Sequence, residues 1–130
     1  MNYSIPENDV FLEKVQQIFS KYLEGYGYSI TSTKNEKMHC KIIYSTDSRR
    51  VEIINQYNYT DYGFSIFIYN TKTNRHNLLA NVPFHKEDKK CVFIEETATA
   101  LLRNHIVESM LSGQTWEDLE KIIYTVKDDR

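Results

Sequence analysis

Residues 37–69 read KMHCKIIYSTDSRRVEIINQYNYTDYGFSIFIY. Apolar and polar side chains alternate along three parts of this segment, which are 37–45, 50–57 and 64–69. A period of two, together with many Ile, Tyr and Phe residues, is typical of strands that bury one face. Turn-forming residues separate the parts, and short links of this kind join antiparallel neighbours. The segment is therefore predicted to form an antiparallel meander.

The alternation also predicts how these strands pair. The expected partners are Tyr44 with Val51, Ile42 with Ile53, Cys40 with Asn55, Met38 with Tyr57, Tyr57 with Phe64, Asn55 with Ile66, and Ile53 with Ile68. In this register one side of the sheet is mostly apolar, and a slip of one residue would turn it outward. We expect that side to form the core. The opposite side is mixed, and either a helix or a partner must cover its apolar centre. This centre consists of Ile43, Ile54, Phe67 and Tyr69.

Helical periodicity flanks the strand region on both sides. Residues 7–24 carry apolar side chains at helical spacing, and two glycines follow, which end helices readily. The C-terminal third predicts one helix over 96–111 and a second over 116–126, with Thr115 as its cap. Additional strands are expected at 28–33, 76–82 and 91–95.

These elements define a fold class. We expect a single α+β domain over residues 1–130, with an N-terminal helix, an antiparallel meander of about five to six strands, and two C-terminal helices packed on one face of the sheet. The chain has no linker rich in Pro, Gly or Ser, and no internal repeat. One domain is the simplest organisation that fits.

The composition excludes several classes of protein. Hydrophobic residues make up 41% of the 130 residues, which excludes a disordered chain. The net charge of −2 argues against an electrostatic nucleic-acid binder, and the paired Arg49 and Arg50 are expected to be solvated at a hairpin tip. No apolar run approaches the roughly 18 residues that cross a bilayer, and the first residues lack the features of a signal peptide. We expect a cytoplasmic protein with no nucleic-acid or membrane partner.

Motifs that indicate catalysis or cofactor binding are missing from the sequence. It has no glycine-rich phosphate loop, no GxSxG turn and no HExxH helix. Cys40 and Cys91 form no CxxC pattern and lie in predicted strands, so we expect two reduced, partly buried thiols. His105 and Glu108 have the spacing of a helical metal site but no matching second pair. The sequence therefore predicts no metal site, no cofactor and no catalytic residue.

Tyrosine is present in informative excess. The chain has ten, and several lie in or beside the predicted hairpin over 57–69. Tyr offers a large contact area with few rotatable bonds and a hydroxyl group, which suits recognition surfaces. The strand propensity of Tyr is the alternative explanation. If these residues bind a partner, the expected contacts are Tyr57, Tyr59, Asp61, Tyr62, Phe67, Tyr69, Ile43 and Ile54.

The sequence favours a protein-binding module over an enzyme. In its most concrete form, it is a toxin-neutralising protein (immunity or antitoxin-like) or a phage or bacterial inhibitor, which occludes a toxin or a defence enzyme stoichiometrically. One alternative is a small-molecule-binding protein or minor enzyme, with a pocket between the sheet and the C-terminal helices. That pocket would be lined by Tyr44, Tyr57, His105 and Trp116. Another alternative is a homodimer through the half-apolar sheet face.

Overall fold

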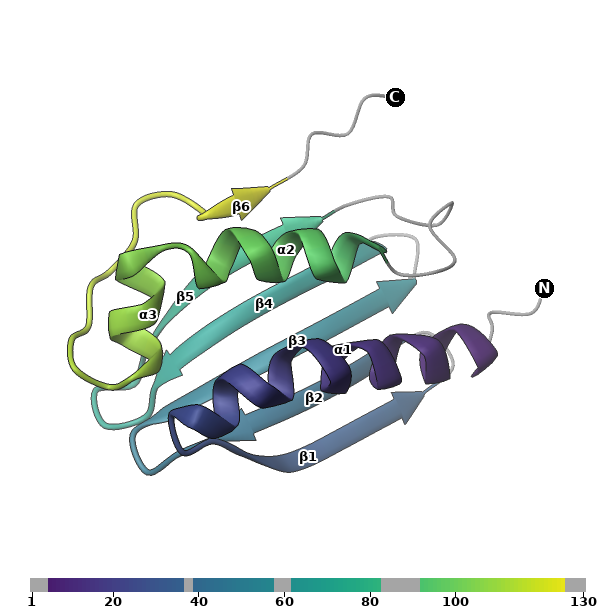
Figure 1. Cartoon of the computed structure of the whole chain (residues 1–130), viewed down its shortest axis with the longest axis horizontal. Helices are drawn as coiled ribbons and strands as arrows, with labels where there is room; N and C mark the ends of the chain where they lie inside the picture. The colour runs from purple at the N-terminus through teal and green to yellow at the C-terminus, as the bar shows by residue number, and fades with distance from the viewer. Residues whose placement is uncertain (1–4, 37–38, 58–61, 83–91, 126–130) are drawn as a thin grey trace.

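The computed structural model describes residues 5–36, 39–57, 62–82 and 92–125 (Figure 1). Its elements in chain order are α1 (Ile5–Gly25), β1 (Ser29–Glu36), β2 (His39–Ser45), β3 (Arg49–Tyr57), β4 (Tyr62–Asn70), β5 (Arg75–Val82), α2 (Val92–Leu102), α3 (His105–Leu111) and β6 (Tyr124–Thr125). The strands form one sheet in the order β1-β2-β3-β4-β5-β6. Neighbours are antiparallel, except that β6 runs parallel to β5. The predicted α+β class, with an N-terminal helix and two C-terminal helices, is confirmed.

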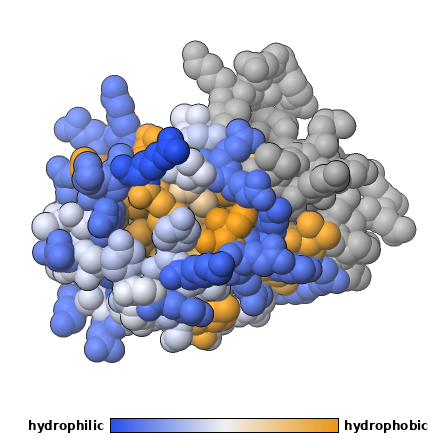
Figure 2. Space-filling view, in the orientation of Figure 1, coloured by the Kyte–Doolittle hydropathy of each residue, from blue (hydrophilic) through white to orange (hydrophobic). Residues whose placement is uncertain are grey.

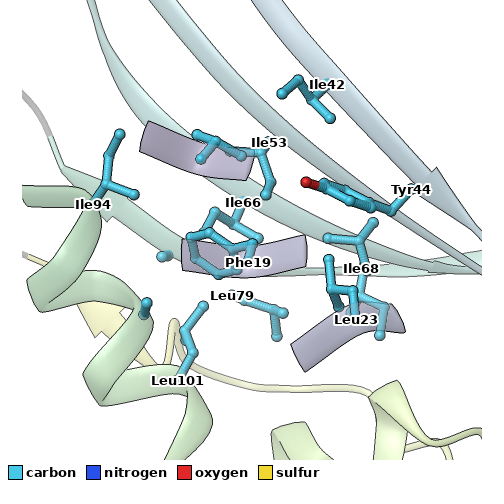
Figure 3. Close-up of a cluster of buried hydrophobic side chains, with 14 of the residues drawn as sticks. Phe19, Leu23, Ile42, Tyr44, Ile53, Ile66, Ile68, Leu79, Ile94 and Leu101 are labelled. Atoms are coloured by element: carbon cyan, nitrogen blue, oxygen red, sulfur yellow. The ribbon is translucent and has the colours of Figure 1, made fainter. Parts of the chain in front are cut away.

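One face of the sheet packs against the helices and forms the core. Figure 1 shows α1 and α2 crossing the same face. Figure 3 shows side chains of both helices directed at the strands. The cluster labelled there consists of Phe19, Leu23, Ile42, Tyr44, Ile53, Ile66, Ile68, Leu79, Ile94 and Leu101, all of them buried. Each buried Leu, Ile or Phe side chain stabilises the fold by about 1.5–3 kcal/mol relative to an exposed one, so this cluster is the main source of stability.

The outer surface of the helices is partly apolar. Leu12, Ile18 and Leu102 are partly buried and pack against the core cluster. Figure 2 shows hydrophobic surface in the centre of this side, surrounded by hydrophilic residues. The helix side is thus polar at its margin and partly apolar in the middle.

The predicted register is right for the first hairpin and wrong for the second. Tyr44 pairs with Val51 and Cys40 with Asn55, as expected. On the other side of β3, Asn55 pairs with Phe64 instead of Ile66, a shift of two residues. The shift arises because β4 already begins at Tyr62, within the predicted turn. Since strand side chains alternate with a period of two, the shift leaves each residue on its predicted face.

The region after β5 differs more from the prediction. The strand expected at 91–95 is wrong, because α2 begins at Val92. A short apolar run fits a strand or a helix equally well, and here Phe93, Ile94 and Ala98 reach the core at helical spacing. The helix expected over 96–111 is split into α2 and α3. Asn104 starts the second helix, since its side chain accepts hydrogen bonds from the next backbone N–H groups.

The helix expected over 116–126 is also wrong: residues 116–123 form an irregular segment with bends, which leads into β6. Two buried polar side chains hold its backbone. Arg49 donates to the carbonyl of Thr115, at 2.9 Å. The Asn77 amide donates to the Glu117 carbonyl at 2.8 Å and accepts from the Leu119 N–H at 2.9 Å. These contacts satisfy backbone groups that a helix would otherwise have paired.

Candidate protein-binding surface

The second face of the sheet carries the apolar centre predicted from the sequence. Directly paired residues share a face, so the register places Ile43, Glu52, Phe67 and Leu78 in one row across four strands. A second row contains Arg50, Tyr69 and His76. We call this side the open face. Its residues are Ser32, Lys34, Glu36, His39, Lys41, Ile43, Ser45, Arg50, Glu52, Ile54, Gln56, Ser65, Phe67, Tyr69, His76, Leu78 and Asn81.

No helix in the described part of the chain covers the open face, because α1 and α2 both cross the other side (Figure 1) and α3 buries Val107, Met110 and Leu111 in the core on that side. Its four predicted apolar residues are half-buried by their neighbours in the sheet. By contrast, Ile42 and Ile53, which alternate with them along the same strands, are completely buried under the helices. The open face therefore has an apolar centre that is partly exposed to solvent.

Aromatic rings and one arginine stack across this centre. The guanidinium carbon of Arg50 lies 4.3 Å from the ring centroid of Tyr69. The rings of Tyr69 and His76 stack with their centroids 5.3 Å apart, and Phe67 lies 6.3 Å from each. Arg and aromatic residues dominate the energetically important contacts of protein interfaces. The stack provides such residues in a fixed arrangement.

Glu52 holds the arginine in this position. Its side chain is almost buried, at 8% exposure for the residue, and accepts a hydrogen bond of 2.8 Å from Arg50 Nε. Lys41 Nζ lies 3.8 Å from the other carboxylate oxygen. A nearly buried carboxylate needs such partners, because an unpaired charge away from water is costly. Burial raises the pKa of the Tyr69 hydroxyl, and the nearby negative charge of Glu52 raises it further. The ring therefore presents a neutral hydroxyl group at physiological pH.

The site residues expected from the sequence fall into two groups. Ile43, Ile54, Phe67 and Tyr69 lie on the open face, where the alternation placed them. The backbones of Tyr57 and Tyr62 pair at the far end of β3 and β4, but their side chains lie outside the described residues. Tyr59 and Asp61 lie outside the described residues entirely.

The alternation placed Glu52 on this face, but Arg50 and His76 were not predicted as parts of the surface. The two arginines were expected to be solvated, yet Arg49 is buried at 5% exposure under the C-terminal segment, 5.3 Å from the Trp116 ring. Arg50 faces the opposite side of the sheet, as strand alternation requires. The alternation along the strand continues from Glu52 back to Arg50, so the sequence pattern could have placed Arg50 on this face.

Three of the residues proposed for the alternative pocket lie in different surroundings, and the side chain of the fourth, Tyr57, lies outside the described residues. Tyr44 is buried, and its hydroxyl lies 2.9 Å from Ser20 Oγ of α1. His105 is exposed at the first position of α3, and Trp116 contacts Arg49. The structure has instead an open hollow of about 620 Å³ near the β2–β3 turn. It is lined by Tyr26, Gly27, Ser29, Thr31, Ser45, Thr46, Asp47, Ser48, Leu111, Ser112 and Gly113.

The chain matches no protein-family model, and it has no significant similarity to a curated protein or to a solved structure. Within the described ranges, no cluster of three or more His, Cys, Asp or Glu side chains is arranged to hold a metal ion. None of the helices described here has the length and apolar character needed to span a membrane.

Proposed function

We propose that the protein is a non-catalytic binding module that docks another protein on the open face. The observation that carries this proposal is the stack of Arg50, Tyr69 and His76, set in a partly exposed apolar centre. Aromatic residues and Arg next to apolar side chains are enriched in the cores of protein interfaces. A partner that covers the centre would bury the apolar residues and leave the charged ones at the rim.

The mode of action that fits best is stoichiometric occlusion. The stack lies on β3, β4 and β5, in the interior of the sheet, so its geometry is fixed by strand pairing rather than by a loop. Residues on rigid elements bind without a large ordering cost. A rigid surface of this kind suits a one-to-one inhibitor. The most concrete form is a toxin-neutralising protein (immunity or antitoxin-like) or a phage or bacterial inhibitor, which covers the working surface of a toxin or a defence enzyme.

Affinity capture with matched variants tests this proposal. The wild-type chain, Tyr69→Ala and Tyr22→Ala serve as baits in lysate of the source cells, and companions are quantified by mass spectrometry. Tyr22 is the control, because it is an aromatic residue exposed at 51% on α1. We expect one companion in about equal amount with the wild type and Tyr22→Ala, and its loss with Tyr69→Ala. Equal recovery with all three baits would reject the open face as the binding surface.

The open hollow favours a second candidate, a protein that binds a polar small molecule. Its lining is rich in hydroxyl groups, including Thr31 and Ser45, whose side-chain oxygens lie 3.0 Å apart. A thermal-shift screen of metabolites tests this candidate, since a ligand at 100 times its Kd stabilises the fold by about 2.7 kcal/mol. A hit that Ser45→Val abolishes would favour this function over the first. A screen without hits would reject it for the metabolites tested.

A further inference from the structure

Among the residues that the structure describes, no strand pairs with the outer edge of β1. β1 is the first strand in the sheet order, and all eight of its residues are exposed. An edge strand of this length presents a row of backbone N–H and C=O groups that a further strand can pair with. A bulge between Ile30 and Ser32 bends its beginning, so the regular part is 32–36.

The end of this strand is held in place by α1. The Asn8 amide donates to the Asn35 side chain at 3.0 Å and to the Glu36 carbonyl at 2.8 Å. Asn35 in turn donates to the Asp9 carboxylate at 3.3 Å. The edge is therefore anchored in a fixed conformation, which lowers the ordering cost of adding a strand.

The open face carries an excess of positive charge beside this edge. Lys34 pairs directly with Lys41, and like charges in that position destabilise a strand pair. Within the described residues, each lysine has a carboxylate at 3.8 Å, and the carboxylate of Glu52 is shared with Arg50. The strand residues of this face thus include three cations, Lys34, Lys41 and Arg50, but two carboxylates, Glu36 and Glu52. Burial lowers the pKa of His39, and the two lysines lower it further, as expected next to excess positive charge.

We infer that the β1 edge binds an extended acidic segment of a partner protein as an additional strand, with a carboxylate beside Lys34. An added strand would lie about 4.8 Å from β1, so its side chain opposite Lys34 would come within cross-strand reach. This inference rests on the proposed function in that it requires a protein partner. It extends the same face by one strand and names the chemistry of the segment that binds there.

A second copy of this chain fits the edge less well. β1 of a second copy would bring one lysine and one glutamate, so each copy would add as much positive as negative charge. The excess beside Lys34 and Lys41 would remain. A strand from another protein, with more carboxylates than amines, would neutralise this excess of positive charge.

Nuclear magnetic resonance with synthetic peptides tests the inference. The probe is an eight-residue peptide in which Thr and Val alternate, except at two positions that are Glu. It is added to the isotope-labelled full chain. The same peptide with Lys in place of Glu is the matched control. We expect chemical-shift changes concentrated at the amides of 32–36, and binding of the Glu peptide about fivefold tighter than that of the Lys peptide. Lys34→Glu should reverse this preference.

Backbone pairing is tested with two proline variants. Successive strand residues direct their N–H groups to opposite sides, so one of Ser32→Pro and Thr33→Pro removes an N–H from the free edge. We expect that variant to keep its melting temperature and lose peptide binding. Equal binding of the Glu and Lys peptides, shifts confined to β4 and β5, or peptide binding retained in both proline variants would overturn the inference. A dimer in sedimentation that one proline variant dissociates would assign the edge to a second copy and overturn it as well.

The Tyr69→Ala variant separates this inference from the proposed function. Its β1 edge is intact, so we expect it to bind the Glu peptide like the wild type. Loss of the cellular partner with this variant, together with no peptide binding by any variant, would reject the inference alone. Peptide binding at β1 together with unchanged partner capture would reject the proposed role of the stack alone.

Discussion

Arg50 and Glu52 lie two residues apart on β3, and the hydrogen bond between them places the guanidinium 4.3 Å from the ring centroid of Tyr69. Because the Glu52 carboxylate is nearly buried, it fixes the arginine more firmly than an exposed ion pair would. The Glu52 carboxylate that anchors the stack is therefore buried against the sheet. The guanidinium of Arg50 and the ring of Tyr69 lie on its outer side.

Removal of this anchor should destabilise the protein. Arg50→Ala leaves the Glu52 carboxylate with Lys41, 3.8 Å away, as its remaining charged neighbour, and should lower the free energy of unfolding by about 1–3 kcal/mol. The double variant Arg50→Ala with Glu52→Gln should recover part of the loss, since no charge is then buried. Urea unfolding of both variants measures the difference. Equal free energies of unfolding for the single and the double variant would contradict the role assigned to Glu52.

Arg49 should hold the C-terminal segment on the sheet. It donates to the carbonyls of Met110 and Thr115, each at 2.9 Å. Arg49→Ala should cost about 3 kcal/mol and speed hydrogen exchange over 114–125, because buried carbonyls lose a charged donor. Arg75→Ala is the control: it breaks the exposed ion pair with Asp118 in the same segment and should cost less than about 1 kcal/mol. Similar exchange rates in the two variants would refute this assignment.

The thiol of Cys40 should be unreactive in the folded protein. Its side chain is fully buried, and burial raises the pKa of the thiol to about 12, with a smaller contribution from the charge of Asp9. Since the thiolate is the reactive form, a thiol reagent should modify Cys40 near pH 8 only as fast as the protein opens. The experiment uses a Cys91→Ser background, in which Cys40 is the remaining cysteine. Rapid modification without denaturant would show that β2 is accessible.

His39 should make stability depend on pH. Burial lowers the pKa of His39 below its usual value of 6.5, and Lys41 and Lys34 lower it further. Below that usual value the unfolded chain binds the proton more readily than the folded chain, so stability should fall as the pH falls through this range. His39→Gln should flatten this part of the curve and leave the slope above about pH 8 unchanged. Urea unfolding at a series of pH values measures both slopes. Parallel stability curves for the wild type and His39→Gln would disprove a contribution from His39.

Much of the sheet could be predicted, because the alternation within each strand determines which face each side chain lies on. The period of two assigned Ile42 and Ile53 to the core and Ile43 and Ile54 to the open face, and a register error of two residues did not alter this. The error itself came from the β3–β4 link, whose turn residues do not fix where β4 begins.

The C-terminal region could not be predicted from its own pattern. Trp116, Leu119 and Ile123 recur at helical spacing and do pack against the core, but from an irregular segment with bends. The deciding contacts come from Arg49 and Asn77, which are 66 and 42 residues away from their respective partners Thr115 and Leu119. Periodicity within one segment carries no information about such partners. The same limit applies to the Arg50–Tyr69–His76 stack, which combines three strands.

The central claim is that the open face binds a protein partner, and the affinity of the captured companion for matched variants tests it most directly. Titration calorimetry would compare the wild type, Tyr69→Ala and Tyr22→Ala after their melting temperatures have been checked. We expect Tyr69→Ala to weaken binding by a factor of about 10 or more, because Tyr69 is central to the proposed interface, and Tyr22→Ala to leave the Kd unchanged. An unchanged Kd for Tyr69→Ala would contradict the claim.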